Sequence, residues 1–167
     1  MQQSQPQVLY TPEQRAKRDA TRWTLVQGVL APVQFLVFLV SLYLVVYSLK
    51  TGDYTDWALA SVVLKTAVLY AIMITGCIWE KVVFDKYLFA PAFFWEDVVS
   101  MWVMALHTAY LWVWWEGSWS AIDQLWLALT AYITYGINAA QYIRKLRMAR
   151  MQKPLPSRVD TTAQVSA

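Results

Sequence analysis

Four long apolar segments dominate this sequence and constrain its fold more than any other feature. They cover residues 23–49, 57–79, 98–115 and 122–142. Each is close to the ~20 apolar residues that an α-helix needs to cross a bilayer. The composition agrees, because 58% of the residues are hydrophobic and ten are tryptophan, which is more apolar surface than one small soluble core can hide. We therefore predict an all-α, polytopic membrane protein with four transmembrane helices.

Positive charges gather at alternate connections between these segments. Four Lys or Arg residues precede the first segment, two lie between the second and third, and six follow residue 143, whereas the other two connections hold only Lys50. Because cytoplasmic loops carry the excess of Lys and Arg, both termini are predicted to be cytoplasmic. The predicted domains are an N-terminal cytoplasmic segment (1–22), a four-helix transmembrane domain (23–142) and a basic, disordered cytoplasmic tail (143–167). Despite the net charge of +3, no aromatic–basic interleaving points to a nucleic-acid partner.

Polar side chains recur at helical spacing inside the apolar segments. The first and fourth segments each carry one such stripe, which is predicted to face the bundle interior rather than lipid. The stripes are Gln27, Gln34, Ser41 and Ser48, and Thr130, Thr134, Asn138 and Gln141. In the second segment, Lys65 is expected to snorkel outward, with projection into a polar interior as the alternative.

Residues 80–97 connect the second and third segments and hold most of the candidate chemistry. The stretch is rich in aromatic residues and is predicted to be an interfacial loop. Its ionisable residues are Glu80, Lys81, Asp85, Lys86, Glu96 and Asp97. Such groups at the edge of an apolar span are costly to bury, which makes them functional candidates. The alternative is that they are interfacial charges that balance one another.

The third segment places several of its polar residues on one helix face. Steps of three and four residues link Glu96, Ser100, Val103, His107, Tyr110 and Trp114. Glu96 and His107 are roughly 16 Å apart along the axis, so they are predicted to line the two ends of one elongated pocket. His107, the only histidine, is a proton donor, an axial ligand to a tetrapyrrole metal or a hydrogen-bonded packing residue. No resident metal site or phosphate-binding glycine loop is visible in the sequence.

Six segments of the sequence resemble the 3-vinyl bacteriochlorophyllide hydratase family of phototrophic bacteria. They are LYTPEQR (9–15), WTLVQGVLAP (23–32), IWEKVVF (78–84), LFAPAFFWED (88–97), ALHTAY (105–110) and YGINAAQ (135–141). The resemblance implies a lyase that adds water to the C3 vinyl group of a chlorophyllide-type magnesium tetrapyrrole on the route to bacteriochlorophyll a. It implies no redox or organic cofactor, and a place in the bacterial inner or intracytoplasmic membrane. Its partners would be the lipid bilayer and other enzymes of the pathway.

The chemistry of hydration suggests roles for the candidate residues. Glu96 is the hypothesised acid that protonates the terminal vinyl carbon, and Asp97 or Glu80 orients the water. His107 either ligates the pigment magnesium or is itself the proton donor. Lys81 or Lys86 meets the pigment propionate. The aromatic residues expected to stack on the ring are Phe93, Phe94, Trp95 and Tyr110.

Two other classes of protein fit the same sequence. One is a non-enzymatic membrane tetrapyrrole- or haem-binding carrier or photosystem assembly protein, in which His107 is a ligand and the carboxylates are interfacial charge. The other is a structural subunit of a larger photosynthetic complex. An enzyme turns its substrate over when purified, whereas a carrier binds it stoichiometrically and leaves the vinyl group unchanged.

Overall fold

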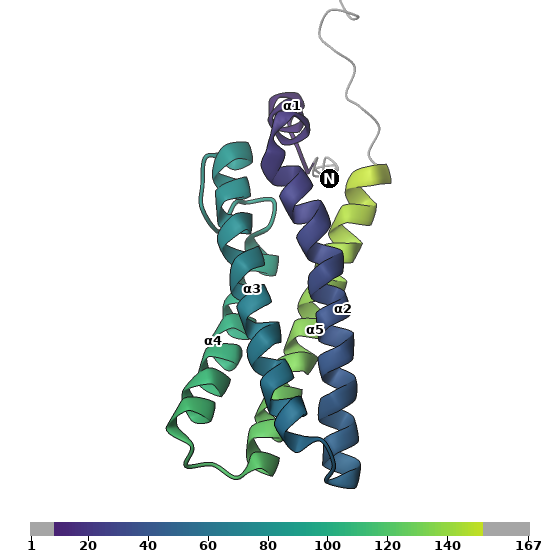
Figure 1. Cartoon of the computed structure of the whole chain (residues 1–167). Helices are drawn as coiled ribbons and strands as arrows, with labels where there is room; N and C mark the ends of the chain where they lie inside the picture. The colour runs from purple at the N-terminus through teal and green to yellow at the C-terminus, as the bar shows by residue number, and fades with distance from the viewer. Residues whose placement is uncertain (1–8, 152–167) are drawn as a thin grey trace, which may run out of the picture.

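The chain forms a bundle of long helices in the computed structural model, which describes residues 9–151 (Figure 1). The helices of that range are α1 (Pro12–Ala20), α2 (Arg22–Thr51), α3 (Thr55–Phe84), α4 (Phe94–Glu116) and α5 (Ala121–Met151). Within the described range there are no strands, which confirms the all-α prediction. The short α1, the 85–93 connection and the end of α5 lie at one end of the bundle, and the turns after α2 and α4 lie at the other.

Three of the helices are long and apolar enough to cross a membrane: α2, α3 and α4. The fourth long helix, α5, packs against both α2 and α4 in the same bundle. It is less apolar because threonine, tyrosine and asparagine side chains interrupt its middle. The structure therefore supports an all-helical membrane protein with three apolar helices, and the predicted fourth span is not among them.

The ends of the helices follow from local side-chain chemistry. Thr11 and Gln14 form a capping box at the start of α1, with Pro12 in the first position. Gly52 ends α2 with a φ of 80°, a left-handed conformation that a residue without a Cβ adopts readily. Ser120 accepts a hydrogen bond from the Asp123 N–H group in the first turn of α5.

Two predicted boundaries are wrong. The interfacial loop was predicted to cover 80–97, but α3 continues to Phe84 and α4 begins at Phe94, so the connection is only 85–93. Helix α3 continues because Glu80 and Val83 extend its buried face by another turn. The basic segment after residue 143 is helical as far as Met151, and the rest of the predicted disordered tail lies outside the described residues.

The polar stripe of α2 faces the interior, as predicted. Gln34, Ser41 and Ser48 are buried, and the half-buried Gln27 donates to Thr75 Oγ1 at 2.7 Å. The oxygen of Ser41 also lies 2.5 Å from the Tyr132 hydroxyl oxygen of α5. These contacts join α2 to α3 and α5 in the middle of the bundle.

The stripe predicted on α5 is only partly internal. Asn138 is buried, but Thr130 is exposed and Thr134 is half-buried. Both threonine hydroxyls donate to carbonyl oxygens four residues earlier in the same helix. A threonine hydroxyl that is satisfied by its own helix needs no partner across the bundle.

Lys65 does not snorkel outward, so the expected position of this side chain was wrong. It is fully buried, on the face of α3 that also carries Val62 and Leu69. Because this face packs into the bundle, the lysine side chain projects into the interior, which was the alternative considered for it.

Candidate functional site

Three buried carboxyl groups meet at the α1 end of the bundle. Glu80 comes from the end of α3, and Glu96 and Asp97 come from the first turn of α4; their exposed fractions are 5%, 7% and 1%. The structure thus brings together the three acids that were singled out in the sequence. The Glu80 and Asp97 side chains are neighbours, and two buried carboxyl groups that lie side by side are more stable when one of them holds a proton.

The same two acids bind the backbone of the 85–93 connection. The Phe89 N–H group donates to Asp97 Oδ2 at 2.8 Å, and the Ala90 N–H group donates to Glu80 Oε2 at 3.3 Å. Phe89 has a φ of 58°, an uncommon conformation for a bulky residue and one that often occurs at functional sites. The Tyr142 hydroxyl of α5 donates to Asp97 Oδ1 at 3.2 Å. Three hydrogen-bond donors, two from the connection and one from α5, therefore fix the positions of the Glu80 and Asp97 carboxyl groups.

Glu96 has a different environment from the other two acids. Its carboxylate oxygens lie 3.0 and 3.1 Å from Lys145 Nζ. Its backbone carbonyl accepts from Ser100 Oγ at 2.8 Å and from Asn138 Nδ2 at 2.9 Å. Glu96 therefore belongs to an ion pair with a residue of α5, whereas Glu80 and Asp97 have no such cation as a hydrogen-bond partner in the described part of the chain.

An aromatic cluster lies beside these acids. Its members come from the segment before α1, the end of α3, the 85–93 connection and the end of α5: Tyr10, Trp79, Phe84, Phe93 and Tyr142. The Tyr10 and Phe84 rings are stacked with centroids 5.7 Å apart, and the Phe93 and Tyr142 centroids are 6.0 Å apart. Burial raises the pKa of the Tyr10 phenol, against the opposing effect of Arg18. The acids therefore have dry, apolar neighbours.

A groove of about 500 Å³ opens next to this cluster. Its walls come from the start of the described chain, the 85–93 connection and the facing ends of α4 and α5. The lining residues are Leu9, Gln14, Phe84, Pro91, Ala92, Trp95, Glu96, Gln141, Arg144, Lys145 and Met148. The volume falls within the range of about 300–1,000 Å³ that is typical of small-molecule sites. Glu96 lines the groove, whereas Glu80 and Asp97 are not among its lining residues.

The two lysines predicted to meet a propionate lie outside the groove. Lys81 Nζ donates to the Asp85 carbonyl at 3.0 Å and lies 5.5 Å from the centroid of the Tyr87 ring. Lys86 is exposed. Neither lysine is a lining residue.

Of the four predicted stacking residues, only Phe94 and Trp95 are brought together, with ring centroids 5.5 Å apart in an edge-to-face arrangement. Trp95 lines the groove and is 70% exposed, Phe93 belongs to the aromatic cluster, and Phe94 is partly exposed next to Phe89. Tyr110 is fully buried in the bundle, where its hydroxyl donates to the Leu59 carbonyl at 2.9 Å. Among the four, Trp95 is therefore the ring that can contact a ligand in the groove.

His107 is fully buried in the middle of α4, and the groove does not reach it. Its Nδ1 atom lies 2.8 Å from the Val103 carbonyl oxygen, and Nε2 has no hydrogen-bond partner within residues 9–151. This arrangement favours the packing alternative. The predicted shared face is otherwise buried, except that Trp114 is 42% exposed and Val113 takes the inner position.

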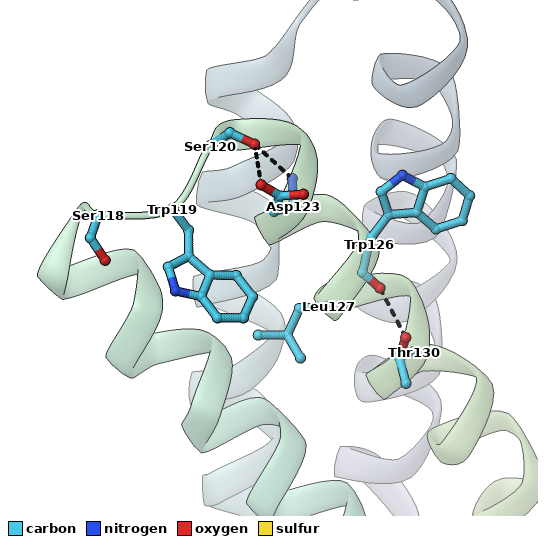
Figure 2. Close-up of a pocket in the computed structure, with 7 residues that line it drawn as sticks. All are labelled: Ser118, Trp119, Ser120, Asp123, Trp126, Leu127 and Thr130. Carbon is cyan, nitrogen blue, oxygen red and sulfur yellow. Dashed lines mark hydrogen bonds between the residues drawn. The ribbon is translucent and has the colours of Figure 1, made fainter.

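A second hollow, of about 580 Å³, lies at the opposite end of the bundle (Figure 2). It is lined by Ser118, Trp119, Ser120, Asp123, Trp126, Leu127 and Thr130. Asp123 is the one ionisable group among these residues, and the Ser120 hydroxyl donates to it at 2.6 Å as part of the start of α5. Although this hollow is slightly larger, it offers no second acid or base. The groove at the carboxyl end is therefore the candidate site.

Sequence reasoning found the polar stripe of α5, which includes the groove-lining Gln141, but missed the other residues of this helix that reach the site. Gln141, Tyr142, Arg144 and Lys145 all contact the groove or the acids, yet the two cations were counted only as charges that orient the chain. The signal was present in the spacing. Asn138, Tyr142 and Lys145 continue the steps of three and four residues that mark one helix face.

Comparison with known proteins identifies the family. Residues 10–148 match the family model described as 2-vinyl bacteriochlorophyllide hydratase. A protein of that name from Cereibacter sphaeroides is 64% identical over 143 residues, which are 86% of this chain and 89% of the relative. Another from Rhodobacter capsulatus is 61% identical over 144 residues, 86% of this chain and 84% of the relative. No solved structure matches the chain. These matches confirm the resemblance found in the six sequence segments, and the chain belongs to the 2-vinyl bacteriochlorophyllide hydratase family.

Proposed function

We propose that this protein is a hydratase that adds water to the vinyl group of a chlorophyllide-type magnesium tetrapyrrole in bacteriochlorophyll biosynthesis. The observation that carries the proposal is the family match, which extends over residues 10–148 and so includes every residue of the candidate site except Leu9. The two relatives are named for the same activity. Their name numbers the vinyl position 2, where the sequence analysis used 3.

Hydration of a vinyl group needs one proton delivered and one proton removed. Protonation of the terminal carbon breaks the π bond, forms a C–H bond and leaves a positive charge on the carbon attached to the ring, where conjugation spreads it. Water then forms a C–O bond at that carbon and loses a proton. A group that gives one proton and takes one back serves both steps.

We propose that the Glu80–Asp97 pair serves in this way, because two neighbouring buried carboxyl groups are most stable when they hold one proton between them. Asp97 accepts from the Phe89 N–H group and the Tyr142 hydroxyl, so it is the better-stabilised carboxylate. Glu80 accepts only the longer bond from Ala90 and is proposed to hold the proton. After donation, two negative charges stabilise the nearby cation, and the proton taken from the added water restores the pair.

Glu96 is proposed to orient the attacking water. It lines the groove, and its pairing with Lys145 keeps it charged, so it accepts a hydrogen bond from water more readily than it gives a proton. These roles exchange the ones suggested by the sequence, in which Glu96 was the acid. The tetrapyrrole ring is proposed to enter through the groove. As its vinyl group reaches Glu80 and Asp97, the hydrogen bonds that these carboxyl groups accept from the Phe89 and Ala90 N–H groups are expected to lengthen.

We place the protein in the bacterial inner or intracytoplasmic membrane with four spans. Helix α5 is the proposed fourth span, because it packs along α2 and α4 in the bundle. The carboxyl site and the N-terminal helix then lie on the cytoplasmic side, where most of the Lys and Arg residues are found. This location gives the site access to a pigment delivered by other enzymes of the pathway.

The activity is tested with detergent-purified protein and chlorophyllide a in ¹⁸O-labelled water. A product heavier by one labelled water, formed without added cofactor, is expected. The same reaction in deuterated water should place one deuterium on the new methyl group. Pigment that binds stoichiometrically and keeps its vinyl group would instead show a carrier.

The proposed acid is tested by Glu80→Gln, which keeps the shape of the side chain but cannot donate a carboxyl proton. We expect kcat to fall by about 10²–10⁴, the usual contribution of general acid–base catalysis. The matched control is Asp123→Asn at the opposite end of the bundle, which should leave kcat unchanged. Full turnover by Glu80→Gln would exclude the pair as the proton donor.

A further inference from the structure

Among the residues that the structure describes, one cation at the groove has no group that compensates its charge. Two basic residues line it, and Lys145 is already bound to both carboxylate oxygens of Glu96. Arg144 makes no hydrogen bond or ion pair with any side chain in the described part of the chain. Its guanidinium group therefore stands at the groove with its donors unused.

The remaining walls of the groove are mostly flat and apolar. Phe84, Pro91 and Trp95 come from the end of α3, the connection and the start of α4, while Leu9 and Met148 complete the apolar lining. The indole of Trp95 is 70% exposed, so its face is available to a planar ligand. The site thus combines an aromatic wall with a single free cation, a combination suited to a flat apolar ligand that carries one carboxylate at its edge.

We propose that Arg144 binds the propionate carboxylate of the tetrapyrrole and so fixes the orientation of the ring in the groove. This inference rests on the proposed function and adds to it the residue that recognises the acidic side chain of the substrate. The planar guanidinium group forms two parallel N–H···O bonds with a carboxylate, which hold the ligand in one orientation better than a lysine does.

Charge complementarity favours Arg144 over the other cations near the site. Lys81 and Lys86 do not line the groove, and Lys81 already donates to Asp85. A carboxylate on Lys145 would compete with Glu96 for the same ammonium group. Arg144 is thus the cation that can bind the propionate without giving up an existing hydrogen bond or ion pair.

Two forms of the substrate and a matched variant test the proposal. Chlorophyllide a and its methyl ester differ only in the carboxylate, so the ester removes the proposed contact from the ligand side. Arg144→Gln removes it from the protein side, and Arg144→Lys keeps the charge without the paired donors. Arg147→Gln is the control, because Arg147 is an exposed cation on the same helix that does not line the groove.

We expect Arg144→Gln to raise KM for the free acid by about 10–100-fold, the range for hydrogen bonds to charged groups, with little change in kcat. Arg144→Lys should give a smaller increase. The wild-type protein should bind the ester as weakly as Arg144→Gln binds the acid, and Arg144→Gln should not weaken ester binding further. Arg147→Gln should match the wild type.

Three results would overturn the proposal. Arg144→Gln could weaken the acid and the ester equally, Arg147→Gln could have the same effect as Arg144→Gln, or the wild type could fail to distinguish acid from ester. Dissociation constants from the absorption of bound pigment give the same comparison without turnover. The protein could discriminate between acid and ester without turning the pigment over. That result would contradict the proposed hydratase but support the proposed contact between Arg144 and the propionate.

Discussion

Lys65 Nζ lies 3.9 Å from the centroid of the Tyr135 ring, so the π-face of a side chain on α5 is the partner of a cation buried in α3. The nitrogen has no hydrogen-bond partner within residues 9–151. A buried charged donor without a partner costs more than the roughly 1–3 kcal/mol of a neutral one, and a desolvated cation–π contact gives back about 2 kcal/mol. The ring thus offsets part of the cost of burying the lysine.

This relationship predicts coupling between Lys65 and Tyr135. Lys65→Met should leave stability equal or raise it by up to about 2 kcal/mol, because it removes the unsatisfied donor. Tyr135→Leu should cost more in the wild-type background than in Lys65→Met, by about 1–2 kcal/mol. Thermal unfolding of the four proteins in one detergent measures the difference. Equal costs in both backgrounds would show that the ring does not stabilise the lysine.

The ion pair between Glu96 and Lys145 gives a second prediction. Its side chains are 9% and 25% exposed, so Lys145→Met leaves a largely buried carboxylate without its cation. Allowing for that partial exposure, we expect a loss of about 2–3 kcal/mol of unfolding free energy. The double variant Glu96→Gln/Lys145→Met should recover most of it, since the charge is gone. A double variant as unstable as Lys145→Met would contradict the pairing.

Tyr142 should contribute to catalysis through Asp97. Tyr142→Phe removes one of the donors that stabilise the Asp97 carboxylate, while keeping the ring that stacks on Phe93. We expect kcat to fall by roughly tenfold with KM almost unchanged, corresponding to one hydrogen bond to a charged group. Steady-state kinetics at saturating pigment measures this. A change confined to KM would place Tyr142 in pigment binding instead.

The N-terminal cap of α1 should affect pigment binding in the groove without acting through the carboxyl groups. Thr11→Ala removes one half of the capping box and should cost about 1 kcal/mol. Because Gln14 is the other half and also lines the groove, KM for the pigment should rise about two- to fivefold, as expected for a fraction of that energy. The control is Ser120→Ala, which removes the cap of α5 at the far end of the bundle and should lower stability without changing KM.

The sequence predicted the features that depend on one helix at a time. The buried face of α4 and the inner stripe of α2 both follow from the spacing of residues along one helix. The three acids near the ends of α3 and α4 were also found, since ionisable residues at the edge of an apolar segment are conspicuous.

The features that depend on another helix were missed. Lys65 was expected to reach the interface, because the ring that receives it lies seventy residues later in the sequence. Lys145 was counted only among the basic residues that set the membrane orientation, because its partner Glu96 becomes apparent only when α5 packs on α4. The pairing of Glu80 with Asp97 depends on the fold of the connection between them, whose left-handed Phe89 no local pattern indicates.

The contribution of α5 to the site has a consequence for how the protein is made. Tyr142 and Lys145 reach Asp97 and Glu96 across 45 and 49 residues of chain. During synthesis, the buried acids of α3 and α4 are therefore delivered to the membrane before the groups that bind them. The acids acquire these partners only when the last helix packs against α4, so completion of the site and completion of the bundle are the same event. A ribosome stalled before that point would hold a chain whose unpaired acids make it a target for membrane quality control.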